Sequence, residues 1–201
     1  MNESPNGMYR TPNQEEIERL PIRCRVAFAA RCARRVQTFI QSRNDQLERL
    51  CQLAEGFAAN NDSSLRGLEL EVRNLASTSP ISASLNMMVS DLVEVLLEAK
   101  AAEFKDGDDP GYAKADRLVN ECCLESDRYG LLNEAVAERD YYRKRNQLLR
   151  QANAHRIAQK ATGIAEAVIS AAIDAGCDDS FISKEMRCDY EALLAAPRGR
   201  P

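Results

Sequence analysis

Apolar residues recur at spacings of three and four along nearly the whole chain, and no segment alternates apolar and polar residues with a period of two. The clearest example runs from residue 22 to residue 42, where Val26, Ala29, Ala33 and Val36 fall on one helical face. The chain has no Trp, and only 9 Gly and 7 Pro in 201 residues. That composition suits helices better than a β-sandwich, which needs frequent turns. The sequence therefore predicts an all-α protein.

The helical pattern is interrupted at Pro21, at residues 60–62 and at the Gly- and Asp-rich residues 105–111. Between residues 149 and 157 the apolar stripe drifts, so we expect two helices or a sharp bend within the last long segment. The expected helices are residues 12–20, 22–42, 45–59, 63–76, 80–104, 112–126, 131–175 and 180–196.

These segments predict one irregular or orthogonal bundle of seven to nine helices over residues 11–196, between a flexible tail at residues 1–10 and a disordered tail at residues 197–201. The helix near residues 80–104 is apolar on almost every side, apart from a strip that contains Asp91, Glu94 and Glu98. We expect it to be the central and most buried helix, with Leu92 and Leu96 fully buried.

Charge is distributed unevenly along the chain. The formal net charge is −4 and the pI is about 5.3, which argues against attraction of the whole protein to nucleic acid or an anionic membrane. Residues 22–43 nevertheless contain six Arg and no acid, and residues 141–160 contain six basic residues and no acid. These two stretches are the candidate binding surfaces.

Helical geometry assigns different roles to the arginines of the first stretch. Arg25 falls inside the apolar arc, so it needs a partner, and we expect the strip near residues 91–98 to supply it. Arg31, Arg34 and Arg35 fall outside the arc. We expect them to point outward and to be available to a partner.

The second stretch combines aromatic and basic residues. Tyr141, Tyr142, Arg143 and Arg145 are the candidate partner-binding residues here. Such a set can hold phosphates and stack bases, so nucleic-acid binding through residues 141–160 is the alternative to protein binding. No helix-turn-helix, G-x-G-x-x-G or Walker pattern accompanies it.

Nothing in the sequence indicates catalysis, a cofactor or a metal. His155 is the sole histidine and lies in a polar, basic stretch, which predicts an exposed side chain rather than a catalytic one. The seven cysteines show no C-x-x-C spacing, and Cys122 and Cys123 are adjacent, so they diverge by about 100° on a helix. We predict no catalytic, cofactor-binding or metal-ligating residues.

The same cysteines bear on location. A chain of this length can build a core without disulfides, and an odd number of cysteines leaves one unpaired. The first residues contain no apolar segment typical of a signal peptide, and the stretch from Leu85 to Leu97 is too short and too charged to span a bilayer. We therefore expect free thiols, a cytoplasmic location and no membrane association.

Two segments resemble a known group of proteins. Residues 26–40, VAFAARCARRVQTFI, and residues 186–196, MRCDYEALLAA, are similar to the opening and closing helices of uncharacterised all-helical bacterial proteins. That group includes proteins proposed as immunity proteins of polymorphic toxin systems. The resemblance implies helical architecture and inhibition of a partner, and it implies no reaction.

The functional hypothesis is a non-enzymatic, cytoplasmic helical protein that binds another protein, as an immunity or regulatory factor. The alternative is a nucleic-acid-associated protein that uses residues 141–160. An enzyme that needs no metal is a third, weaker interpretation. The sequence leaves the oligomeric state open.

Overall fold

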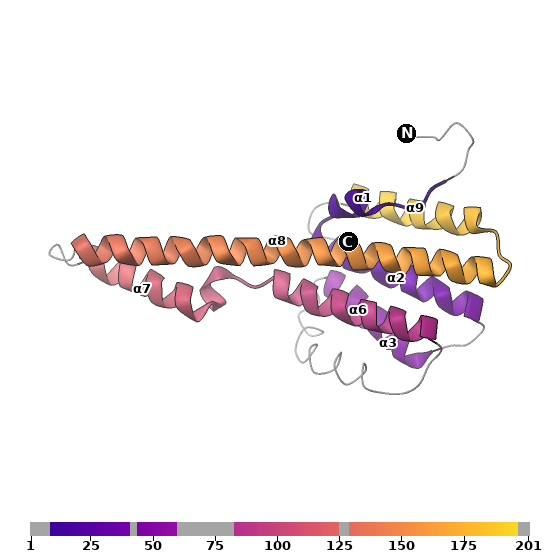
Figure 1. Ribbon diagram of the computed structural model, residues 1–201, viewed down its shortest axis with the longest axis horizontal. Helices are drawn as coiled ribbons and strands as arrows, with labels where there is room; N and C mark the ends of the chain where they lie inside the picture. The colour runs from indigo at the N-terminus through magenta and orange to yellow at the C-terminus, as the bar shows by residue number, and fades with distance from the viewer. Residues whose placement is uncertain (1–8, 41–43, 60–82, 125–128, 197–201) are drawn as a thin grey trace. The chain divides into compact units, whose positions relative to one another are not determined.

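The computed structural model describes residues 9–40, 44–59, 83–124 and 129–196, and these residues confirm the all-α prediction. They form seven α-helices and one short 3-10 helix, with no strand within the described ranges (Figure 1). Four predicted segments lie wholly or partly outside the described residues: residues 1–8 of the tail predicted at 1–10, the helix at 63–76, the start of the helix at residue 80, and the tail at 197–201. The helices are α1 (Gln14–Glu18), α2 (Ile22–Ile40), α3 (Asp45–Ala58), α6 (Ala83–Ala102), η1 (Asp106–Asp108), α7 (Pro110–Leu124), α8 (Tyr129–Asp174) and α9 (Asp179–Ala195).

The chain divides into two compact units, where the sequence predicts one domain over residues 11–196. Unit 1 comprises Met1–Ala99 and Ala154–Pro201, and unit 2 comprises Lys100–Asn153. The boundaries fall inside α6 and inside α8, so both helices contribute residues to each unit.

Unit 1 is built around α2, which packs against α3 and α9. Of the α2 side chains that the structure describes, Thr38 alone is exposed, and Phe28 and Val36 are completely buried. The prediction that the helix near residues 80–104 is the most buried was wrong, because α6 exposes Met87 and Glu94. The abundant Ala in α2 explains the difference, since small side chains let neighbouring helices approach on several sides.

The prediction for two leucines of α6 is confirmed. Leu92 and Leu96 are both 0% exposed, together with Val95 on the same side of the helix. The inward face of α9 is also as predicted: Ile182, Met186, Tyr190 and Leu193 are buried. In both helices the residues at apolar spacing are buried, because removing an apolar face from water is favourable.

The segment from residue 129 to residue 174 is one continuous helix of 46 residues, so α8 is not divided into two helices near residues 149–157. The less exposed side chains continue through that region at spacings of three and four, but several of them are polar: Arg139, Asn146, Arg150 and Asn153. Polar residues on the inward face interrupted the apolar stripe without interrupting the helix.

A glycine ends α8. Gly176 has φ +72°, in the left-handed region that residues with a Cβ avoid. The Gly176 amide donates to the Ile173 carbonyl and the Cys177 amide donates to the Ala172 carbonyl, both at 2.9 Å. This pair of bonds satisfies carbonyls at the helix end and directs the chain into α9.

Unit 2 is a helical hairpin in which α7 lies alongside the N-terminal part of α8 (Figure 1). Its small core consists of Ala115, Val119 and Cys122 from α7 and Ala135 from α8. Asp109 accepts hydrogen bonds from the amides of Gly111 at 2.8 Å and Tyr112 at 3.4 Å, which satisfies the start of α7.

Candidate functional site

The arginines of α2 make ion pairs inside unit 1. Arg34 contacts Glu55 at 2.6 Å and Glu48 at 3.1 Å, both on α3. Arg35 contacts Asp189 of α9 at 2.6 Å, and Arg31 contacts the same carboxylate at 3.4 Å. Arg35 also contacts Glu185 at 3.2 Å. We expected Arg31, Arg34 and Arg35 to point outward and to be available to a partner, and each is instead paired with an acid of α3 or α9.

These ion pairs place the side chains of Arg31, Arg34 and Arg35 between helices. Arg34 joins α2 to α3, and Arg31 and Arg35 join α2 to α9. Carboxylates hold the guanidinium groups in defined orientations. The cations of α2 are therefore used in packing within unit 1.

The acidic strip of α6 faces α8. Lys160 contacts Asp91 at 2.8 Å and Glu94 at 2.9 Å, and Arg156 contacts Glu98 at 3.0 Å. Hydrogen bonds to the two carboxylates raise the pKa of Lys160. A salt-bridged strip was expected, but Arg25 was the wrong cation. Two members of the predicted basic stretch at residues 141–160 neutralise the strip instead.

Arg25 finds its partners in the backbone. Its guanidinium donates to the carbonyl oxygens of Glu18, Leu20 and Ala154. Burial lowers the pKa of Arg25, and the nearby Glu18 carboxylate opposes that effect. The five donors of a guanidinium can serve several carbonyls at once, which explains how this cation tolerates a position inside the apolar arc.

His155 is exposed, as predicted, with 61% of its side chain accessible. Its Nδ1 lies 2.8 Å from a carboxylate oxygen of Glu18, and both ring nitrogens lie 3.5 Å from Gln14. The arrangement contains an imidazole and a carboxylate, but no Ser or Cys nucleophile contacts the ring in the part of the chain that the structure describes.

The cysteines are free thiols and divide into two groups. Cys24, Cys32, Cys51 and Cys122 are buried, whereas Cys123, Cys177 and Cys188 are exposed. Burial raises the pKa of Cys32 and of Cys51 to about 12. Within the described ranges, no three His, Cys, Asp or Glu side chains come together in a way that could hold a metal ion.

The four candidate residues of unit 2 lie on two different faces of α8. Tyr142 packs on Gly111 of α7, and Arg143 donates to the Tyr112 hydroxyl at 3.2 Å. Tyr141 is 64% exposed, and the exposed Arg145 places its guanidinium 5.9 Å from the centre of the Tyr142 ring. Tyr142 and Arg143 therefore hold the hairpin together, while Tyr141 and Arg145 remain accessible.

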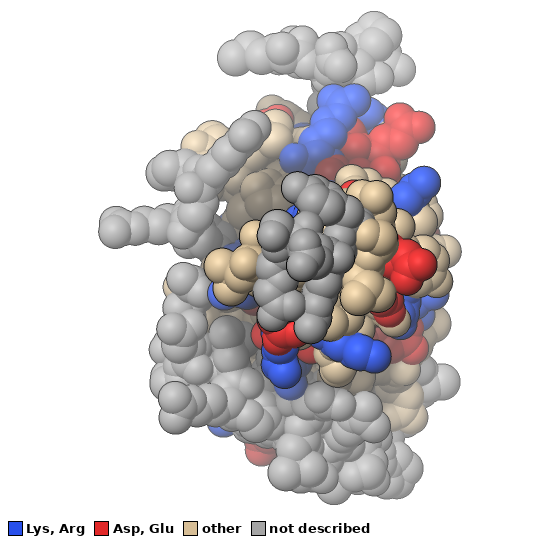
Figure 2. Space-filling view, turned by 90° about the vertical axis from the view of Figure 1, so that its left-hand side faces the viewer, with Lys and Arg blue, Asp and Glu red and all other residues tan. Residues whose placement is uncertain are grey.

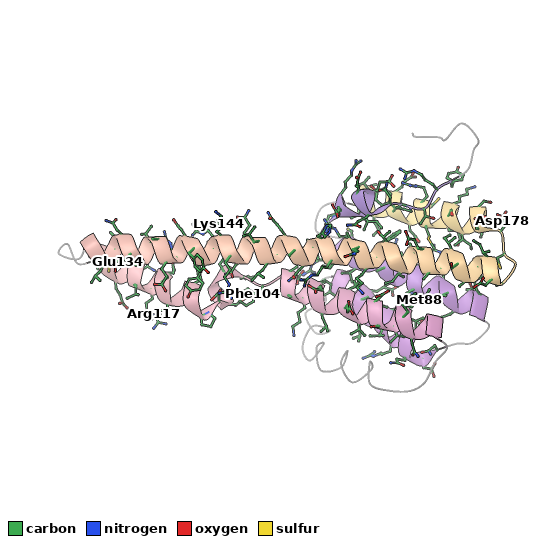
Figure 3. All side chains as sticks on the ribbon, viewed as in Figure 1. Met88, Phe104, Arg117, Glu134, Lys144 and Asp178 are labelled. Carbon is green, nitrogen blue, oxygen red and sulfur yellow. The ribbon has the colours of Figure 1, made fainter. Side chains whose placement is uncertain are left out.

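The face of α8 that carries Tyr141 and Arg145 is the candidate functional site. It also exposes Leu131 and Leu148, which are 56% and 58% accessible, and the two carboxylates of Glu134 and Glu138. In Figure 3, Lys144 lies on the side of α8 away from α7. We call the six residues Leu131, Glu134, Glu138, Tyr141, Arg145 and Leu148 the outer seam.

Sequence reasoning found only two members of the outer seam. The others were missed because the search followed basic and aromatic residues, and two of the missed residues are acidic. A usable signal was present, since the six positions follow one another at spacings of 3, 4, 3, 4 and 3. Half of the six seam residues are charged, so the row does not stand out as an apolar periodicity in the sequence.

Two shallow hollows lie among the described residues of unit 1. One, of about 770 Å³, is lined by Phe39, Met87 and Asp91, and by small and acidic residues between Gly163 and Ala175. The other, of about 510 Å³, lies between Phe39, Phe181 and the exposed Cys177. None of the predicted binding residues of unit 2 lines either hollow, and Arg35 in the second is already paired with acids.

Positive charge does not gather into one field on the face drawn in Figure 2, where basic and acidic side chains are intermixed among the described residues. The cations of the 141–160 stretch are divided between the units, and Arg143, Arg150, Arg156 and Lys160 all make ion pairs. For Lys144 and Arg145 the structure shows no ion pair with a described residue.

No protein-family model, curated protein or solved structure matches this chain. Among the described helices, none is sufficiently long and apolar to cross a membrane.

Proposed function

We propose that the chain is a non-enzymatic helical protein that binds another protein through the outer seam of α8. The observation that carries this proposal is the exposure of three large apolar side chains, Leu131, Tyr141 and Leu148, on one helix face. Each of them loses contact with water only when something covers the seam, and apolar burial contributes about 25 cal/mol per Å². Grouped exposed apolar residues are typical of interaction surfaces.

The opposite face of the same helix supports the assignment. Arg139 contacts Asp116 at 3.4 Å and Arg150 contacts Asp106 at 2.8 Å, so intramolecular polar contacts already occupy the side of α8 towards α7. The hairpin thus satisfies its inner face within unit 2. The outer seam exposes Leu131, Tyr141 and Leu148 between charged side chains, and of its six residues Tyr141 and Arg145 also contact the Tyr142 ring within the hairpin.

Two finer statements belong to the same proposal. A cytoplasmic location is supported by the seven free thiols, because reducing compartments keep cysteines in that form. An immunity or regulatory role is supported by the resemblance of residues 26–40 and 186–196 to bacterial immunity proteins.

Site-specific photo-crosslinking tests the proposal. A benzophenone amino acid replaces Leu148 on the seam or, as a matched control, the exposed Gln147 beside it. We expect a discrete protein adduct from position 148 in cells that express the chain natively, and much less from position 147. Equal labelling at both positions, or none at either, contradicts a protein-binding seam.

The same experiment addresses the alternative function. If position 148 labels nucleic acid, and if binding of the chain to DNA or RNA falls steeply with salt, the nucleic-acid interpretation of residues 141–160 replaces the proposal. Lys144 and Arg145 would then be the phosphate-binding cations, because neither forms an ion pair with a carboxylate of the described residues.

A further inference from the structure

We propose that the outer seam binds a second copy of the same chain, with the two α8 helices antiparallel. This inference rests on the proposed function and names the partner of the same site. Three observations carry it: the heptad spacing of the seam, the order of charges along it, and the absence of ion pairs for its carboxylates within the described residues.

The seam has the spacing of a coiled-coil interface. Its positions 131, 134, 138, 141, 145 and 148 alternate steps of three and four, which is the a and d pattern of a heptad repeat. All six side chains are exposed, so the row is available along its whole length. Three of the six positions, Leu131, Tyr141 and Leu148, carry the apolar side chains that such an interface buries, and the other three carry charge.

The two halves of the seam carry opposite charges. Acidic residues occupy the N-terminal half, at Glu134 and Glu138, and Arg145 occupies the C-terminal half. With a two-fold axis between positions 139 and 140, a copy running the other way places Leu131 opposite Leu148. The same register places Glu134 opposite Arg145, and Glu138 opposite the hydroxyl of Tyr141.

A two-fold axis doubles each of these pairs, because an isologous interface repeats every contact. The outer positions become leucine pairs, the next positions become ion pairs, and the centre contains two carboxylate–phenol pairs. Apolar contacts therefore lie at the ends of the seam, and polar contacts fix the register between them.

The parallel arrangement is disfavoured by the same residues. In that orientation each residue faces its own copy, so Glu134 meets Glu134, Glu138 meets Glu138 and Arg145 meets Arg145. Like charges at facing positions are destabilising, and the seam has charge at half of its positions. The order of charges thus selects the antiparallel pair.

The seam carboxylates are free to make these contacts. Neither Glu134 nor Glu138 forms an ion pair with any residue in the described ranges, whereas Glu48, Glu55 and Asp189 of unit 1 are all paired. Arg145 lies over the ring of Tyr142 and interacts electrostatically with Asp109, and it forms no ion pair with a described residue. In the antiparallel pair, a second copy supplies the cation that Glu134 does not have within the described residues.

Sedimentation equilibrium of the full chain over a wide concentration range tests the inference. We expect a monomer–dimer equilibrium for the wild type, and a dissociation constant at least about tenfold higher for Leu148→Asp. Gln147→Asp is the matched control, since it adds the same charge one residue away and outside the seam. Helical content measured by circular dichroism should be equal in all three proteins, because both positions are exposed.

Charge exchange tests the orientation. Glu134→Arg and Arg145→Glu should each weaken self-association at least about tenfold, because each places like charges opposite one another. An equimolar mixture of the two variants should associate as well as the wild type. In the mixed pair the two substituted side chains face each other, and native Arg145 faces native Glu134. In a parallel pair each variant alone would keep like charges at both facing positions, as the wild type does, so it would not weaken self-association, and the mixture would associate more tightly than the wild type.

The outcomes separate this inference from the proposed function. A wild-type chain that stays monomeric, a Leu148→Asp variant that still dimerises, or variants that do not complement each other all overturn the antiparallel self-association. In those cases, an adduct from position 148 with a different protein would leave the proposed function standing. Absence of any adduct would remove the proposed function as well.

Discussion

The guanidinium of Arg25 donates a hydrogen bond to the carbonyl oxygen of Ala154, a residue 129 positions away in the sequence. Two further bonds from the same group reach the carbonyls of Glu18 and Leu20 at the end of α1. One side chain therefore ties α1, α2 and α8 together within unit 1. A cation in this position must be hydrogen-bonded, because an unpaired buried charge is costly.

We expect Arg25→Ala to lower the free energy of unfolding by about 1–3 kcal/mol, because hydrogen bonds to a charged group are lost and carbonyls lose their donor. Arg25→Lys should recover less than half of this, since an ammonium group cannot reproduce the planar fork of donors. Urea unfolding measures both. Arg10→Ala is the control, with a side chain that is 61% exposed, and it should change stability by less than about 0.5 kcal/mol. Equal effects at positions 10 and 25 would contradict the role given to Arg25.

The core of unit 1 provides a second prediction. Leu92 and Leu96 are fully buried in α6, whereas Met87 on the same helix is 52% exposed. Replacing either leucine by Ala should cost about 2–5 kcal/mol, because a cavity remains where the side chain was. Met87→Ala should cost less than about 0.5 kcal/mol. Thermal or urea unfolding of the three variants decides the order, and a leucine variant as stable as the Met87 variant would contradict this description of the core.

The apolar faces of the helices could be predicted from the sequence, and the partners of the charged residues could not. Leu92, Met186 and Tyr190 were placed correctly because periodic apolar residues must all turn to the same side. Arg34 and Arg35 were placed outward by the same helical geometry, yet they bind acids of α3 and α9. Long flexible side chains reach neighbours whose positions depend on how the helices pack, and spacing within one helix contains no such information.

The length of α8 and the outer seam show the same limit. Asn146 is buried and polar, so its place on the inward face of α8 could not be recognised from hydrophobicity. Glu134 and Glu138 are exposed and acidic, so they were not grouped with Tyr141. In both cases the position along the helix determines which face a residue lies on. The residue type alone would place polar Asn146 in solvent and would separate the two glutamates from Tyr141.

Stability near pH 4 should depend on Glu16. Hydrogen bonding from Arg187 lowers the pKa of Glu16, burial opposes this, and the Asn13 amide contributes a further lowering. Because the pKa is lower in the folded state, the ionised carboxylate stabilises the fold above its unfolded pKa of about 4.3. That contribution is lost as the pH falls through the folded-state pKa.

We therefore expect Glu16→Gln to reduce the free energy of unfolding at pH 7 by roughly 1 kcal/mol, and to lose less stability than the wild type between about pH 5 and pH 3. Glu15→Gln, at an exposed position of the same helix, is the matched control and should follow the wild-type curve. Denaturant unfolding across this pH range is the measurement. Parallel curves for the wild type and Glu16→Gln would show that Glu16 is not linked to folding.

Thiol reactivity should separate the cysteines into two groups, three that react fast and four that react slowly. Cys123, Cys177 and Cys188 are exposed, so a thiol reagent at pH 8 should modify them in the folded protein. Cys24, Cys32, Cys51 and Cys122 are buried, and burial raises the pKa of Cys32 and Cys51 to about 12, which leaves almost no thiolate. These four should react only after denaturant is added. Rapid modification of five or more thiols in the native protein would be inconsistent with the burial of α2 and α3.

The packing of unit 2 can be tested at Gly111, where α7 begins beside the ring of Tyr142. A Cβ at position 111 would lie 2.8 Å from the Tyr142 hydroxyl oxygen and closer still to its ring carbons. Gly111→Ala should therefore destabilise the hairpin by about 1–3 kcal/mol, even though Ala is normally the better helix former. Gly130→Ala, where the new Cβ meets nothing within 4 Å, should cause no loss. Hydrogen exchange of the α7 amides measures the effect locally. In a Tyr142→Leu background the ring tip is gone, so Gly111→Ala should then be nearly neutral. If Gly111→Ala is just as harmful in that background, the close approach of Gly111 to Tyr142 does not set the spacing between α7 and α8.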